Sequence, residues 1–139
     1  MNTNTLPGIV KVRMLRCDVL PPHLMSMSLC GALIALASPS VTVKFYGQPM
    51  LKWEGTTVDG ARQEKATLEF SSTDRLPEGE RLAFVVTVAS GKQYLVGTRE
   101  PKYPQINYTE TTGAPDGDAA LRTYKITHVA LKSVLPCIL

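Results

Sequence analysis

Residues 82–96 read LAFVVTVASGKQYLV and indicate the fold more directly than any other stretch of this chain. Two β-rich runs, Leu82–Val88 and Gln93–Val96, are joined by a short turn around Ser90-Gly91. Because glycine accepts the positive φ that tight turns need, the pattern predicts an antiparallel hairpin. Both faces of LAFVVTV are apolar, which places this strand in the middle of a sheet or between two sheets.

Alternation of apolar and polar side chains extends the β pattern on both sides of the hairpin. Residues 41–46 and 66–71 alternate before it, and residues 122–131 alternate after it. Such runs predict strands with one face in the core and the other in water. Gly47-Gln48-Pro49 is expected to end the first run, and Ile106–Tyr108 to form a short strand.

The fold class that these patterns predict is all-β. We expect an antiparallel β-sandwich or open barrel of about seven or eight strands with one short helix. Thr109–Ala120 (TETTGAPDGDAA) is expected to be one long loop, and the apolar C-terminal residues 134–139 are expected to be packed. At 139 residues, a single domain spanning residues 1–139 is expected.

Composition and charge are those of an ordinary globular chain. Hydrophobic residues make up 44% and charged residues 19%, and the formal net charge is +3, which argues against intrinsic disorder. The densest basic patch, Lys11, Arg13 and Arg16, is interrupted by apolar residues. Because it forms no continuous basic run, no nucleic-acid partner is indicated.

The segment Leu24–Ala37 (LMSMSLCGALIALA) imitates a secretory signal peptide. However, it begins far into the chain, behind a strand-like segment and Pro21-Pro22, and it is too short and too polar to span a membrane. We therefore expect it to stay in the folded protein, with a helical turn from His23 to Gly31 followed by a core strand over Leu33–Ala37. The expected location is the cytoplasm, and secretion is the alternative.

The chain has three cysteines, Cys17, Cys30 and Cys137, at wide and irregular spacing. An odd count without a CxxC pair is a poor disulfide framework and offers no zinc ribbon. We expect all three thiols to be reduced, as in a reducing compartment, with a single disulfide as the alternative.

No motif of catalysis, cofactor binding or metal binding is present, so we predict no catalytic, cofactor or metal residue and no enzymatic activity. His128 lies on an alternating strand, which favours a packed or edge histidine over a catalytic one, and His23 has no acidic neighbour at metal-ligand spacing. Asp116-Gly117-Asp118 begins like a calcium loop, but Thr127 stands where an EF-hand needs glutamate. The phosphate-binding, dinucleotide-binding and nucleophile-elbow glycine motifs are absent.

Three aromatic residues are the candidates for a protein interface. Tyr103 and Tyr108 flank the predicted long loop, and tyrosine combines apolar area with a polar tip. Trp53 lies between Lys52 and Glu54, which fits either the edge of the core or an exposed contact.

The second half of the chain resembles small uncharacterised proteins from prophages and integrated elements of gut anaerobes. The resemblance runs from Glu64 to the C-terminus, a little over half of the chain, and rests on SGKQYLVGTREPKYP (residues 90–104) and the LPC ending. It implies a non-enzymatic virion-assembly protein, at the head–tail junction or in the tail. It also suggests self-association into a ring, for which Pro101–Tyr108 and the Thr109–Ala120 loop are the expected contacts, and a monomer with a solvated loop is the alternative.

Three classes of function therefore remain open. The first is a structural protein that assembles with protein partners. The second is a secreted or surface β-sandwich that binds a ligand or a host component, which requires the signal-like segment to be a genuine signal peptide. The third is a small enzyme with a dispersed site.

Overall fold

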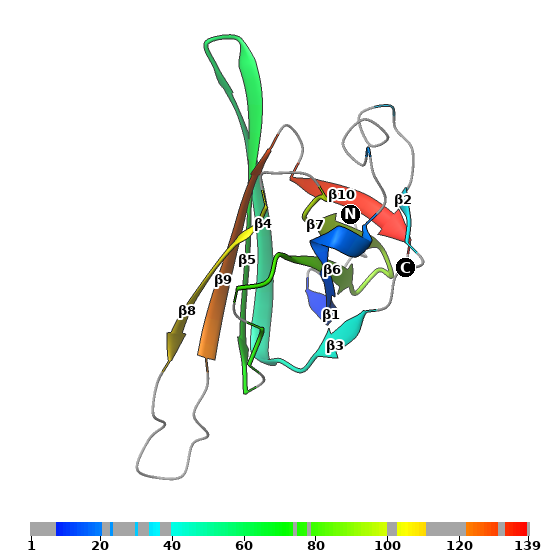
Figure 1. Cartoon of the computed structure of the whole chain (residues 1–139), viewed down its shortest axis with the longest axis vertical. Coiled ribbons are helices and arrows are strands. Elements are labelled where there is room, and N and C mark those ends of the chain that lie inside the picture. Colours follow the sequence, from blue (N-terminus) through cyan, green and yellow to red (C-terminus); the bar gives the residue numbers. More distant parts are fainter. Residues whose placement is uncertain are drawn as a thin grey trace, which may run out of the picture.

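The computed structural model describes residues 8–20, 23, 30, 34–36, 40–73, 75–77, 79–99, 103–110, 122–130 and 133–138. These residues form two β-sheets that pack face to face, as Figure 1 shows. The antiparallel β-sandwich expected from the sequence is therefore confirmed. The barrel alternative is not the arrangement observed.

The larger sheet has six strands in the order β2-β10-β7-β6-β1-β3. Every neighbouring pair is antiparallel except β10 and β2, which run parallel. The strands are β1 (Ile9–Arg16), β2 (Ile34–Ala35), β3 (Val41–Val43), β6 (Leu82–Val88), β7 (Gln93–Val96) and β10 (Val134–Ile138).

The smaller sheet has four strands in the order β4-β5-β9-β8, and all of its neighbours are antiparallel. Its strands are β4 (Tyr46–Val58), β5 (Ala61–Ser72), β8 (Gln105–Glu110) and β9 (Arg122–Ala130). The described residues thus hold ten strands, more than expected, because β4 was not predicted as a strand and the residues of β10 were expected only to be packed.

The predicted hairpin is confirmed in register. Phe84 lies opposite Val96 and Thr87 lies opposite Gln93, so β6 and β7 pair as expected. The turn is closed by hydrogen bonds from the Val88 amide to the Lys92 carbonyl (3.0 Å) and from the Gly91 amide to the Val88 carbonyl (2.9 Å). Gly91 has a φ of 93°, which explains the glycine at this position.

The strand β6 is buried on both faces, as its two apolar faces predict. Phe84 and Val86 face the smaller sheet, where they join Phe70, Tyr124 and Ile126 in the main core. The opposite face of the larger sheet is covered by residues at η1 (Cys17–Val19) and just after it, by Leu36 and by Tyr103. This second cluster holds Leu15, Cys17, Leu20, Leu36, Ala83, Val85, Leu95, Leu135 and Cys137, with Tyr103 packed against it.

Part of the signal-like segment Leu24–Ala37 belongs to this packed fold. Ile34–Ala35 form β2, and the Leu36 amide donates a 2.7 Å hydrogen bond to the Ile138 carbonyl. The predicted core strand over Leu33–Ala37 is therefore confirmed at its centre. The predicted helical turn from His23 to Gly31 lies almost wholly outside the described residues, and η1 precedes it.

Gly47-Gln48-Pro49 does not end a strand, which corrects the sequence-based expectation. The alternating run 41–46 is instead divided between β3 and β4, and β4 continues through these three residues to Val58. The pairing of β4 with β5 shifts register between Tyr46 and Met50. These turn-forming residues produce a local irregularity in β4 and do not end the strand. Proline is tolerated there because β4 is an edge strand, so the missing amide hydrogen costs no hydrogen bond between strands.

The hairpin formed by β4 and β5 extends beyond the rest of the sheet, as Figure 1 shows. Its turn consists of Asp59 and Gly60, with φ values of 51° and 80°, the double positive φ of a tight two-residue hairpin turn. Because β9 pairs with β5 only from Glu64 onward, residues 56–63 form a two-stranded ribbon. We call these residues the arm.

The segments around the predicted long loop differ partly from expectation. The strand predicted over Ile106–Tyr108 is confirmed, but β8 runs on to Glu110, so Thr109 and Glu110 belong to the strand rather than to the loop. The remainder of the predicted loop lies outside the described residues. The C-terminal segment is packed as expected, since Leu135 and Cys137 are buried in β10.

The burial of Phe84 gives a first prediction. Its side chain is fully buried between the sheets, so Phe84→Ala should lower the free energy of unfolding by about 3–5 kcal/mol in chemical denaturation. Val10→Ala is the matched control on the neighbouring strand, because Val10 is 58% exposed and should cost less than about 0.5 kcal/mol. Equal effects of the two substitutions would contradict this assignment of the core.

Candidate functional site

The strand β4 forms one edge of the smaller sheet. Among the described strands it is hydrogen-bonded only to β5, so its other side presents unpaired backbone amide and carbonyl groups. Successive side chains of a strand point to opposite faces. Leu51 and Trp53 therefore point to the inner face, towards the larger sheet, whereas Lys52 and Glu54 point to the outer face.

The inner side of β4 carries an exposed tryptophan. Trp53 is 46% exposed, although its ring lies against Tyr94 of β7, with 5.8 Å between ring centroids and 42° between planes. The two rings line a groove of about 840 Å³ between the sheets, and Met50, 55% exposed, lies at its border. The remaining lining is mostly apolar and includes Ile9, Pro49, Leu51 and Val88.

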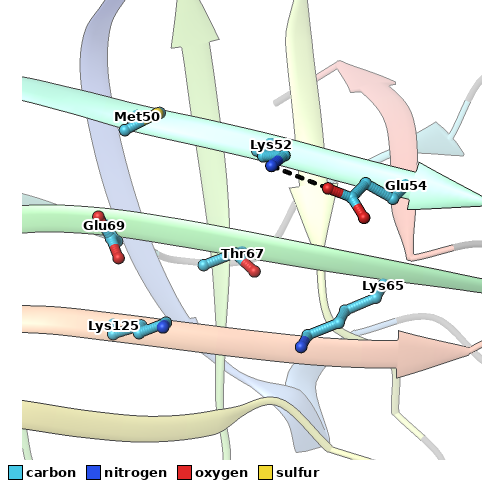
Figure 2. Close-up of a pocket in the computed structure, with 7 residues that line it drawn as sticks. All are labelled: Met50, Lys52, Glu54, Lys65, Thr67, Glu69 and Lys125. Atoms are coloured by element: carbon cyan, nitrogen blue, oxygen red, sulfur yellow. Dashed lines mark ion pairs between the residues drawn. The ribbon is translucent and has the colours of Figure 1, made fainter.

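The outer face of β4 is charged, as Figure 2 shows. Lys52 Nζ lies 2.8 Å from Glu54 Oε1, and both side chains are more than half exposed. The same face continues over β5 and β9 with side chains of both charges around a depression of about 280 Å³. Met50, Lys52, Glu54, Lys65, Thr67, Glu69 and Lys125 line it.

Each member of the Lys52–Glu54 pair favours the charged form of the other. The hydrogen bond and charge of Glu54 raise the pKa of Lys52, and those of Lys52 lower the pKa of Glu54. Both groups therefore remain ionised near neutral pH. Because water screens exposed charges, the pair adds little to folding stability, and its main effect is to place a defined charge pattern beside the free edge.

We call Met50–Gly55 and Tyr94 the β4 surface. It combines an unpaired strand edge, an exposed aromatic pair on one face and a charged pair on the other. Such a surface is suited to binding an extended segment of another protein, since backbone groups supply hydrogen bonds and alternate side chains supply specificity. It contains no nucleophile paired with a base.

The structure does not bring the three candidate interface residues together. Trp53 lies on β4 and Tyr108 on β8, at opposite edges of the smaller sheet. Tyr108, 46% exposed, lies beneath the Arg122 guanidinium at 4.1 Å. Tyr103 packs against the second cluster on the far side of the larger sheet, and Arg81 stacks over its ring at 4.5 Å.

The pocket beside Tyr103 carries charges of both signs. It measures about 400 Å³ and is lined by Arg16, Arg81 and Arg99 together with Asp18 and Glu80. Arg16 is already paired with Asp18 at 3.0 Å, so the pocket does not present a uniformly basic surface. It therefore gives no specific indication of an anionic ligand.

The histidines do not form a reactive site in the described part of the chain. His128 is 1% exposed, and its Nδ1 lies 3.5 Å from the Ser133 carbonyl oxygen, so it is the packed histidine that the alternation predicts. His23 is exposed. No group of three or more histidine, cysteine, aspartate or glutamate side chains converges among the residues that the structure describes.

Several residues of the β4 surface were missed by the sequence analysis, namely Met50, Lys52, Glu54 and Tyr94. One signal for them is present in the sequence, because Asp59-Gly60 is among the strongest hairpin signatures known. This turn signature predicts a strand that runs from Trp53 to Val58. The proximity of Tyr94 has no local signature, since it depends on how the two sheets pack.

Comparisons with protein-family models, with curated proteins and with solved structures found no match to this chain. Among the described residues, no helix is long and apolar enough to cross a membrane.

The cysteines give a second prediction. All three are free thiols, with Cys30 exposed and the other two buried. Burial raises the pKa of Cys17 to about 11 and that of Cys137 to about 12, which suppresses the reactive thiolate. A thiol reagent near neutral pH should modify Cys30 rapidly in the native protein, and Cys17 and Cys137 only after denaturant is added.

The same pKa shifts predict a loss of stability at alkaline pH. The unfolded chain ionises these thiols near their ordinary pKa, about 8.5, whereas the folded chain does not, so unfolding becomes more favourable above that pH. The loss should continue up to the raised values and should be smaller in a Cys137→Ala variant. Rapid modification of Cys17 and Cys137 in the native protein would contradict their placement in the core.

Proposed function

We propose that the protein is a non-enzymatic structural protein that assembles with protein partners through the β4 surface. The observation that carries the proposal is Trp53, a half-exposed tryptophan on the free edge strand of a sheet. Tryptophan and tyrosine are enriched at protein interfaces because they bury large apolar areas while keeping a polar tip. A role in a prophage virion, as the resemblance of the second half implies, would be of this kind.

The arm supports the same proposal. Its described side chains are exposed, and it is only two strands wide. An isolated two-stranded hairpin is marginally stable in water. A partner that covers a ribbon extending beyond its sheet therefore stabilises it.

A ligand-binding module is the second candidate, and the groove beside Trp53 favours it. Its volume of about 840 Å³ lies within the usual range of small-molecule sites, and its lining is largely apolar. Assembly and ligand binding can be distinguished by measuring the molar mass together with the solvent exposure of Trp53. Assembly should raise the molar mass as Trp53 becomes shielded, whereas ligand binding should shield Trp53 at constant mass.

A third prediction tests assembly directly. Trp53 is the sole tryptophan, so its fluorescence reports on the β4 surface without a label. Over a concentration series, we expect light scattering to show a rising molar mass and acrylamide to quench Trp53 progressively less. Trp53→Ala should weaken the association at least about tenfold, because truncating a central interface tryptophan commonly costs 2 kcal/mol or more.

Tyr108→Ala is the matched control, since Tyr108 has the same 46% exposure on the opposite edge of the sheet. It should leave the association unchanged. A monomer at every concentration with Trp53 freely quenched would contradict the proposal. A loss of association with Tyr108→Ala alone would move the contact to β8.

A further inference from the structure

We infer that the partner of the β4 surface is a second copy of this chain, whose β4 pairs antiparallel with the first across a two-fold axis at Trp53. The inference rests on the proposed function and specifies its partner and register. In this arrangement each residue faces the one at the mirrored position about residue 53. Trp53 faces the partner's Trp53, and Lys52 faces the partner's Glu54.

The free edge of β4 is the longest that the described strands offer. Its regular pairing with β5 runs without interruption from Met50 to Val58. The other outer strands are shorter, with six residues in β8, three in β3 and two in β2. Pairing two copies of β4 would join two four-stranded sheets into one continuous sheet.

Charge complementarity selects the register. Lys52 and Glu54 lie on one face, two residues apart, on either side of Trp53. An antiparallel two-fold at Trp53 places each lysine opposite a glutamate of the other copy, so that four charges alternate in sign around a square. Opposite charges at facing positions stabilise a sheet, and like charges destabilise it.

The neighbouring registers on the same strand are disfavoured. A two-fold at Lys52 would place two lysines face to face, and a two-fold at Glu54 would place two glutamates face to face. Both would also keep Trp53 from meeting its own copy. The charge pattern therefore distinguishes one register from its nearest competitors, although the backbone would allow each of them.

The apolar side of the strand fits the same register. With the axis at Trp53, the two tryptophans lie on the inner side beside each other, where each covers the exposed part of the other. The arm of each copy continues past Pro49 of its partner. Proline lacks an amide hydrogen, and the register of β4 shifts between Tyr46 and Met50, so ladder pairing should end there and the dimer should be closed.

The decisive experiment uses two charge reversals, Lys52→Glu and Glu54→Lys, alone and mixed. Each variant alone faces itself with like charges, so its dimer should be at least about tenfold weaker than that of the unmodified chain. Mixed in equal amounts, the two variants face each other with opposite charges and should form a heterodimer. Within each variant chain, positions 52 and 54 carry the same charge whether or not the variants are mixed. Association that mixing restores must therefore come from contacts between chains.

A cross-link checks the register independently of charge. In a Cys30→Ser background, Met50→Cys mixed with Thr56→Cys should give a disulfide-linked dimer, because these positions face each other when the axis lies at Trp53. Either variant alone should give little, since its two copies of the new cysteine would lie about 20 Å apart. The two single variants are thus their own controls.

The outcomes separate this inference from the proposed function. Association that depends on Trp53 but is not restored by mixing the charge variants would overturn the two-fold register and leave assembly through the β4 surface intact. Failure of the Met50→Cys and Thr56→Cys mixture to cross-link would overturn it as well. A chain that stays monomeric at every concentration would overturn both.

Discussion

The strand β6 is apolar on both faces, and most of the architecture follows from the need to cover both. Phe84 and Val86 are covered by the smaller sheet, whereas Ala83 and Val85 lie in a cluster covered by Cys17 and Leu20 around η1, by Leu36 and by Tyr103. Burying a large apolar side chain stabilises the fold by about 1.5–3 kcal/mol relative to leaving it in water. Neither cover can be lost without exposing half of this strand.

The way in which the two faces of β6 are covered determines which strand edges remain free for partners. The smaller sheet uses the inner face of its two central strands, β5 and β9, to cover Phe84 and its neighbours. Its outer strands β4 and β8 extend to the rim of the core, where Trp53 and Tyr108 are each 46% exposed. The candidate site is thus a consequence of the sandwich, because the outer strand β4 is only partly covered by the core and keeps one free edge.

The sequence allowed the central hairpin and the alternating strands to be predicted, because both patterns are local. The burial of Leu68 and Phe70 in β5, and of Tyr124 and Ile126 in β9, follows the alternation directly. The position of β4 at an edge was beyond such reasoning. It depends on pairings between distant residues, such as Glu64 with Ala130, and on a sheet order that no local pattern encodes.

Trp53 illustrates the limit of local reasoning most clearly. From sequence it fitted either a core edge or an exposed contact, and in the structure it has features of both, since one part of the ring rests on Tyr94 and the rest is open. What decides its environment is the packing of β7 beneath β4. That packing is tertiary, so a tryptophan between two charged residues carries no signal for it.

Residues that protect an edge strand from unwanted pairing can also specify a wanted one. Lysine, proline and register irregularities are the usual means by which proteins prevent edge-to-edge aggregation, and β4 has Lys52, Pro49 and a register shift. Lysine alone would repel another copy only in the register centred on it. With Glu54 two residues away, the same lysine repels in the registers centred on either charge and attracts in the one centred between them. Specificity of this kind arises from penalties on the alternatives as much as from attraction to the partner.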